Sequence, residues 1–181
     1  MRYKLLKQLF LFILFFGLFG CNKNDLRGMF FSYDDVNERF DESMRWNDAH
    51  PYTNIVSPEN EYQLFVMADS HIGTTKNYQV FIDNSLKTSA LAVVMNGDIT
   101  TGYKNDYIRL KNIIPPIDSI YSFLLVGNHE LYYEGWKQFY SQFGSSIYYF
   151  TVSTPTAKDI FICLDSGSGT LGSKQMNWLK N

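Results

Sequence analysis

An alternation of short apolar runs with helix-like segments, between Tyr62 and Val126, constrains the fold of this chain more than any other feature. The apolar runs are rich in strand-forming residues, and the segments between them space their apolar residues as helices do. Strands that alternate with helices predict an α/β fold with a largely parallel or mixed sheet. The expected strands are 62–68, 90–95 and 121–126, and the expected helices are 77–86 and 103–114.

The chain on either side of this alternation divides into further parts. Residues 22–60 are polar and rich in turn-forming residues, with a short helix possible at 36–46, and we expect them to form a tether and lead-in. The globular domain is therefore expected to span residues 61–181. Its second half should contain a helix at 136–143, strands at 147–152 and 160–164, a loop at 166–172 and a last helix that begins near Ser173.

The first 21 residues have the pattern of an export signal. Three basic residues precede the apolar run 9–20, which is short for a membrane span but fits the apolar region of a signal peptide. The small Gly20 directly before Cys21 favours a bacterial lipoprotein signal, in which Cys21 becomes the lipidated first residue. We therefore expect an exported protein that a lipid anchor holds to the membrane of the cell envelope, on the periplasmic or outer-membrane side. A cleaved secretion signal and an uncleaved anchor are the alternatives.

Composition excludes some partners and leaves others open. The formal net charge is -2, and no cluster of Lys and Arg with interleaved aromatic residues is present, so we expect no surface that binds nucleic acid. Cys163 lies in an apolar run and is expected to be a buried thiol. Because Cys21 has a separate explanation, the two cysteines predict no disulfide framework. The oligomeric state stays open.

Three polar motifs come directly after the three expected strands. They are Asp69-Ser70-His71, Gly97-Asp98 and Gly127-Asn128-His129-Glu130. Asp98 lies 29 positions after Asp69, and Asn128 lies 30 positions after Asp98, which is close to the length of one strand-helix-strand unit. Ligand sites in open α/β sheets form outside the carboxyl ends of the strands. The spacing therefore predicts that the three motifs converge on one place.

The residue types in these motifs suit a divalent cation. Asp69 and His71, separated by one residue after a strand, can bind one cation, although a helix-capping Asp with an ordinary polar His explains the pair equally well. Asp98 can bridge two cations with its carboxylate, and its alternative is turn chemistry after Gly97. Asn128 offers an amide oxygen as a ligand, and the imidazole of His129 can donate a proton.

Together the three motifs resemble the signature of the calcineurin-like metallophosphoesterase family, which runs Asp-x-His, Gly-Asp and Gly-Asn-His-Asp/Glu. The resemblance extends from Tyr62 to Asn181 and includes Asp165 and the segment 175–179. It implies the N-terminal part of an α/β sandwich in which helices flank mixed β-sheets. It also implies a metal-dependent hydrolase of phosphate esters.

Carried over residue by residue, the resemblance assigns a role to each motif. It makes Asp69 and His71 ligands of a first metal, Asp98 the bridge between two metals, and Asn128 a ligand of the second. His129 would not bind metal and would protonate the departing oxygen. Two divalent ions, Mn, Fe or Zn, would hold the substrate phosphate and activate a bound water or hydroxide as nucleophile.

The chain departs from the family pattern in two ways. Thr101 stands where many members carry a carboxylate that orients the imidazole, so the orienting partner of His129 is unidentified. The family also uses three later histidines, and this chain has only His50, His71 and His129. We therefore expect a truncated N-terminal portion of a longer enzyme, inactive alone. The alternative is a non-catalytic envelope lipoprotein that keeps a remnant of the fold as a binding module.

The substrate itself is left open by these motifs. Monoesters, diesters, nucleotides and phosphoproteins all share the phosphate that the motifs would bind. Tyr132, Tyr133 and Trp136, which lie just after the third motif, can stack on a substrate ring or pack in the core.

Overall fold

A computed structural model describes Gly28, residues 34–72 and residues 76–181. The expected signal peptide 1–21 and its Cys21 lie outside the described residues, so both stay predictions. Within the described part of the chain, no helix is long and apolar enough to cross a membrane.

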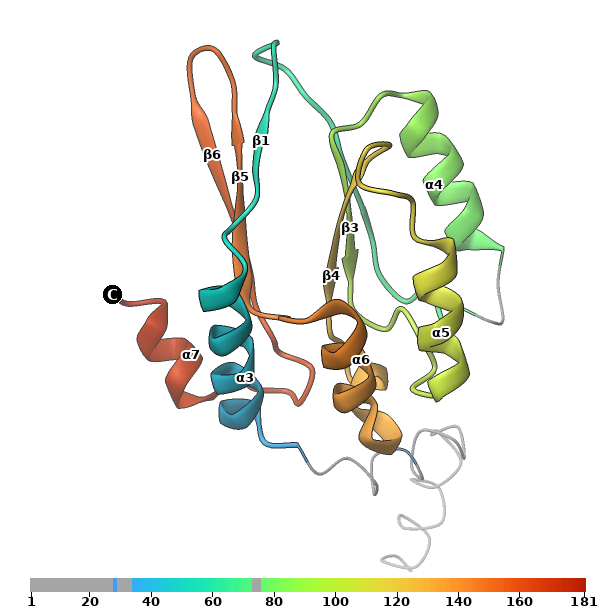
Figure 1. Cartoon of the computed structure of the whole chain (residues 1–181), viewed down its shortest axis with the longest axis vertical. Coiled ribbons are helices and arrows are strands. Elements are labelled where there is room, and N and C mark those ends of the chain that lie inside the picture. The colour runs from blue at the N-terminus through green and yellow to red at the C-terminus, as the bar shows by residue number, and fades with distance from the viewer. Residues whose placement is uncertain (1–27, 29–33, 73–75) are drawn as a thin grey trace, which may run out of the picture.

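Two three-stranded sheets form the centre of the molecule (Figure 1). The parallel sheet has the order β2-β3-β4, with every neighbouring pair parallel. The mixed sheet has the order β1-β5-β6, in which β1 and β5 are parallel and β5 and β6 are antiparallel. The strands are β1 (Asn54–Val56), β2 (Leu64–Met67), β3 (Ala92–Asn96), β4 (Tyr121–Leu125), β5 (Tyr148–Ser153) and β6 (Lys158–Cys163).

Helices lie on the outer sides of the two sheets. Figure 1 shows α4 and α5 beside the parallel sheet, and α3 and α7 beside the lower part of the mixed sheet. The predicted α/β architecture of mixed sheets flanked by helices is confirmed. The helices are α3 (Val36–Ala49), α4 (Asn77–Lys87), α5 (Lys104–Ile113), the 3-10 helix η1 (His129–Glu134), α6 (Gly135–Phe143) and α7 (Gly172–Trp178).

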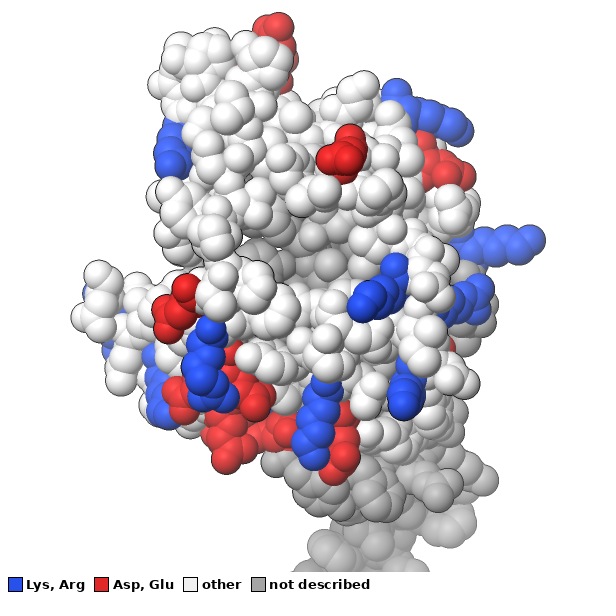
Figure 2. Space-filling model, in the orientation of Figure 1, with Lys and Arg blue, Asp and Glu red and all other residues white. Residues whose placement is uncertain are grey.

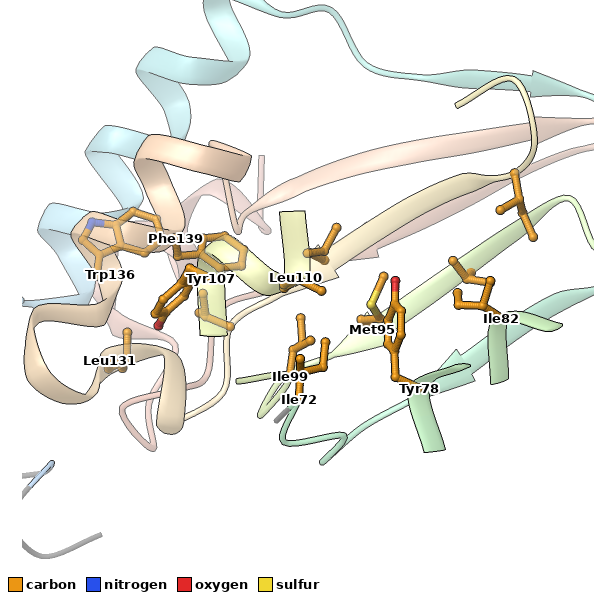
Figure 3. Close-up of a cluster of buried hydrophobic side chains, with 14 of the residues drawn as sticks. Ile72, Tyr78, Ile82, Met95, Ile99, Tyr107, Leu110, Leu131, Trp136 and Phe139 are labelled. Atoms are coloured by element: carbon orange, nitrogen blue, oxygen red, sulfur yellow. The ribbon is translucent and has the colours of Figure 1, made fainter. Parts of the chain in front are cut away.

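Each face of the parallel sheet packs against a different layer. On the helix side, Met95 of β3 joins a cluster that contains Tyr78 of α4, Leu110 of α5 and Phe139 of α6 (Figure 3). On the other side, Phe123 of β4 stacks on Phe150 of β5, with ring centroids 3.7 Å apart. Alternate residues of a strand point to opposite faces, so one short strand serves both cores. The parallel sheet is thereby held between helices and the mixed sheet.

Residues 34–60, which we expected to belong to a tether and lead-in, contribute two elements to the globular body. Strand β1 pairs with β5, and α3 carries Arg39, whose guanidinium Nε donates to the Asp165 carboxylate at 2.7 Å. Both side chains are fully buried. The strand was not predicted because β1 is only three residues long and its partner lies almost a hundred positions away.

Candidate metal centre

The loops after β2 and β3 run side by side and are joined by backbone hydrogen bonds. The N–H of Asp69 donates to the carbonyl of Gly97 at 3.2 Å, and the N–H of His71 donates to the carbonyl of Asp98 at 3.1 Å. A third bond joins the N–H of Ile72 to the carbonyl of Ile99 at 2.7 Å. These bonds fix the first two motifs against each other independently of their side chains.

The loop after β4 approaches the loop after β3 so closely that both require glycine. Gly97 has a φ of 79°, and a Cβ there would lie 2.8 Å from the backbone nitrogen of Gly127. A Cβ on Gly127 would in turn overlap the Asp98 carboxylate. Such contacts with backbone and with a packed side chain leave no room for a methyl group. The glycines of the second and third motifs therefore permit the close approach of their loops.

Three of the predicted ligands have left-handed backbone conformations. The φ angles are 54° at Asp69, 40° at His71 and 48° at Asp98. A positive φ is uncommon for residues with a side chain, and such strain is concentrated at functional sites, where the surrounding structure holds it in place. Here the hydrogen bonds between the loops supply that restraint.

The convergence predicted from motif spacing holds for His71, Asp98 and His129. Each offers one possible ligand atom, and these atoms all lie within 4.8 Å of one another. All three residues are half-buried. Two imidazole nitrogens and a carboxylate oxygen are a suitable donor set for Mn, Fe or Zn. The residues therefore fit a divalent cation, and the ring of His129, which the family resemblance keeps off the metal, belongs to the group.

Hydrogen bonds orient two members of this group. His71 Nδ1 lies 3.3 Å from the carbonyl oxygen of Thr100. A carbonyl can only accept, so Nδ1 carries the proton and Nε2 is left as the nitrogen that can bind a cation. The Asp98 Oδ1 accepts the backbone N–H of His129 at 3.0 Å. The loop after β3 is thus bonded to His71 of the first motif through Thr100 and to His129 of the third motif through Asp98.

Asp69 and Asn128 occupy less enclosed positions. Both are exposed, and Asp69 is not a member of the group of possible ligand atoms described above. The Asn128 amide nitrogen donates to the Tyr132 hydroxyl at 2.7 Å, which leaves its carbonyl oxygen as a possible ligand. The ligand roles of Asp69 and Asn128 stay predictions. Thr101, which stands at the position of the missing orienting carboxylate, donates its backbone N–H to Asp106 at 3.1 Å.

Glu130, the last residue of the third motif, has a structural role that the sequence did not reveal. Its side chain is fully buried, and Oε1 accepts from Thr100 N at 2.8 Å and from Thr100 Oγ1 at 2.9 Å. Oε2 accepts from Gly127 N at 2.9 Å. Burial raises the pKa of the Glu130 carboxyl, and the bonds from Thr100 and Gly127 oppose this rise. Only the acidic residue type, directly after His129, hinted at such a function.

The aromatic residues beyond the third motif divide between core and surface. Trp136 is only 1% exposed and Tyr132 is 8% exposed, so both belong to the packed interior. Tyr133 is half-buried and stacks on the exposed Tyr103, with ring centroids 4.8 Å apart. Of the two alternatives left open by the sequence, core packing is confirmed for Trp136 and Tyr132.

A separate cavity of about 440 Å³ lies away from the three loops. Its lining includes aromatic residues of α3, β4, β5 and α7, among them Trp46, Phe123, Tyr149 and Trp178. None of His71, Asp98 and His129 lines it. Figure 2 shows charged residues gathered over α3 and α6 on the lower part of one face, and an uncharged hollow above them.

Comparisons with known proteins agree with the geometry of the site. Residues 62–179 match the family model of the calcineurin-like phosphoesterases, and the chain belongs to this family. The comparison with curated proteins and the comparison with solved structures each gave no match. Membership is carried by the segment that contains all three motifs and both sheets apart from β1.

Proposed function

We propose that this protein hydrolyses phosphate esters with the help of a dinuclear metal centre at the carboxyl ends of β2, β3 and β4. The observation that carries the proposal is the convergence of His71, Asp98 and His129 from three separate loops. Membership of the calcineurin-like phosphoesterases supports the same reaction class. Two bound cations would supply a binding site for the phosphate, an activated water and stabilisation of the developing charge.

We assign ligand roles to four residues of the site and the role of proton donor to a fifth. His71 is oriented through Thr100 to present Nε2, and Asp98 accepts from His129 N at one oxygen while the other can face a cation. Asp69 and Asn128 would add further oxygen ligands. We assign to His129 the role of proton donor to the leaving oxygen, since an imidazole can carry that proton near neutral pH.

Manganese binding and turnover test this proposal together. Manganese-stimulated release of nitrophenol from nitrophenyl phosphate is measured on the 181-residue chain and on any longer product of the same gene. We expect activity that Asp98→Asn abolishes, and calorimetric manganese binding that the same substitution weakens. Absence of both turnover and metal binding in every form of the protein would favour the alternative of a binding module and would end the proposal.

Replacement of His129 separates its two possible roles. If His129 donates a proton, His129→Ala should lower kcat by about 100-fold or more while the manganese dissociation constant stays near the wild-type value. His71→Ala is the matched control, because removal of a ligand should weaken metal binding. Equal loss of manganese affinity in the two variants would show that His129 is a ligand instead of an acid.

The cellular location is a further part of the proposal and rests on the N-terminal sequence alone. We propose that the chain is exported and held to the membrane of the cell envelope through lipid on Cys21. In cells that express the full chain, labelled palmitate should be incorporated into the wild type and not into Cys21→Ser. Cys163→Ser is the control, since the buried Cys163 should have no part in anchoring. Equal labelling of the wild type and Cys21→Ser would refute the anchor.

A further inference from the structure

The loop that carries Asp98 and the loop that carries His129 are joined directly at the candidate ligands. The bond runs from His129 N to Asp98 Oδ1 at 3.0 Å, and it involves a predicted ligand itself. A cation on the other oxygen of Asp98 would draw charge from the same carboxylate and weaken this bond. A connection that involves no ligand would hold the two loops together whether or not metal is bound.

Glu130 supplies such a connection with both of its carboxylate oxygens. Oε1 accepts two bonds from Thr100, which lies two residues after Asp98, and Oε2 accepts one bond from Gly127, at the start of the third motif. The carboxylate is buried and lies outside the group of possible ligand atoms. The backbone carbonyl of Glu130 accepts from the Tyr107 hydroxyl at 3.1 Å, which also connects Glu130 to α5.

The bonds at Thr100 extend this connection to His71. The backbone N–H of Thr100 donates to Glu130, and the carbonyl of the same residue accepts from His71 Nδ1. Thr100 is thus held by Glu130 and in turn orients the predicted ligand His71. The hydroxyl of Thr100 also accepts from Gly102 N at 3.1 Å, so the turn after the second motif depends on the same side chain.

We propose that Glu130 is the positioning residue of the metal centre: its carboxylate fixes Thr100 to Gly127 and thereby holds the predicted ligands His71 and Asp98 and the proposed proton donor His129 in their relative positions. This inference rests on the proposed function for the identity of the site, and it adds the residue that keeps the site assembled.

The substitution Glu130→Gln tests the proposal with the smallest change of shape. The amide keeps one acceptor and places an NH2 group against a backbone donor, so at least one loop must shift. We expect manganese to bind about 10- to 100-fold more weakly in calorimetry, the range typical for partners that orient metal ligands. Thr100→Val, which removes the hydroxyl bonds to Glu130 and Gly102 but keeps the backbone bond to Glu130, should give a smaller loss.

Gln175 offers a matched control in the other half of the molecule. It is also fully buried, and its amide makes three hydrogen bonds, two to the backbone of Asp165 and one to the carbonyl of Leu171. Gln175→Leu should lower the urea midpoint and leave manganese affinity within about twofold of the wild type. If Glu130→Gln and Gln175→Leu affect manganese affinity equally, the effect of Glu130 is general stability and the proposal fails.

Amide spectra of the metal-free protein distinguish this inference from the proposed function. Glu130→Gln should shift the N–H resonances of Thr100, Gly127 and His129, whereas Gln175→Leu should leave them in place. A wild type that binds no manganese would overturn the proposed function, and these spectra would still decide whether Glu130 positions the loops. Unshifted resonances of Thr100 and His129 in Glu130→Gln would overturn the positioning role.

Discussion

The parallel sheet and the mixed sheet differ both in the loops that leave their strands and in the contacts that hold them together. The strands of the parallel sheet are close in sequence, and the loops after them carry all the candidate ligands. The mixed sheet carries none of these ligands among its described residues, and it joins β1 and α3 to segments about a hundred positions later. Strands and helices that follow one another in sequence thus form the site, whereas contacts between residues far apart in sequence join β1 and α3 to the mixed sheet.

This difference has a simple physical origin. Parallel strands that succeed one another through helices place their carboxyl ends at one edge, so residues far apart in sequence meet there. The antiparallel strands β5 and β6 have their carboxyl ends at opposite edges of the mixed sheet. The mixed sheet is therefore suited to supply an apolar face against Phe123, and the parallel sheet to supply the polar edge.

Loss of the buried ion pair between Arg39 and Asp165 should lower the stability of the protein more than any other change considered below. Arg39→Met leaves the Asp165 carboxylate buried without its guanidinium partner, and we expect a loss of about 3–5 kcal/mol of unfolding free energy in urea. The double variant Arg39→Met/Asp165→Leu should recover part of that loss. Manganese affinity, measured where the variant is folded, should stay unchanged. A loss below about 1 kcal/mol would contradict the importance of this contact.

Alkaline pH should lower the free energy of unfolding through Cys163, which lies in the core between the two sheets. Burial raises the pKa of this thiol from 9.0 to about 12. The folded state therefore retains a proton that the unfolded state loses, so stability is complete below pH 9 and falls as the pH rises toward 12. At about pH 11 the loss from this group should be about 3 kcal/mol, at about 1.4 kcal/mol per pH unit.

The variant Cys163→Ala isolates this contribution. Its unfolding free energy should fall less steeply than that of the wild type between about pH 9 and about pH 11, because other groups titrate in both proteins. The measurement is urea denaturation at several pH values. Identical slopes would show that the thiol is not protected by the fold.

A methyl group on Gly97 should disturb the parallel-sheet side. The substitution Gly97→Ala introduces a Cβ 2.8 Å from the backbone of Gly127 at a φ of 79°, and the expected loss of stability is about 1–3 kcal/mol. Calorimetry should show weaker manganese binding as the two loops separate. Gly169→Ala is the control, since its φ is also positive but no atom lies within 4 Å of the added Cβ. Equal metal affinity in the two variants would contradict the close approach.

The smallest effect is expected at the surface between α3 and α7. Lys174 pairs with Asp41, and both side chains are well exposed. Exposed pairs are screened by solvent, so Lys174→Ala should cost about 0.2–1 kcal/mol in urea and less at high salt. A loss as large as that of Arg39→Met would mean that burial does not distinguish the two ion pairs.

The sequence by itself determined the succession of strands and helices from Leu64 to Trp178, because their apolar periods and turn residues act locally. It also determined that the three motifs would converge, since strand ends in a parallel sheet share one edge. Only the tertiary structure decided that His129 lies among the possible ligand atoms while Asp69 does not. The pairing of β1 with β5 and the bonds of Glu130 to Thr100 and Gly127 were likewise visible only in the tertiary structure. Each depends on partners that no local sequence pattern specifies.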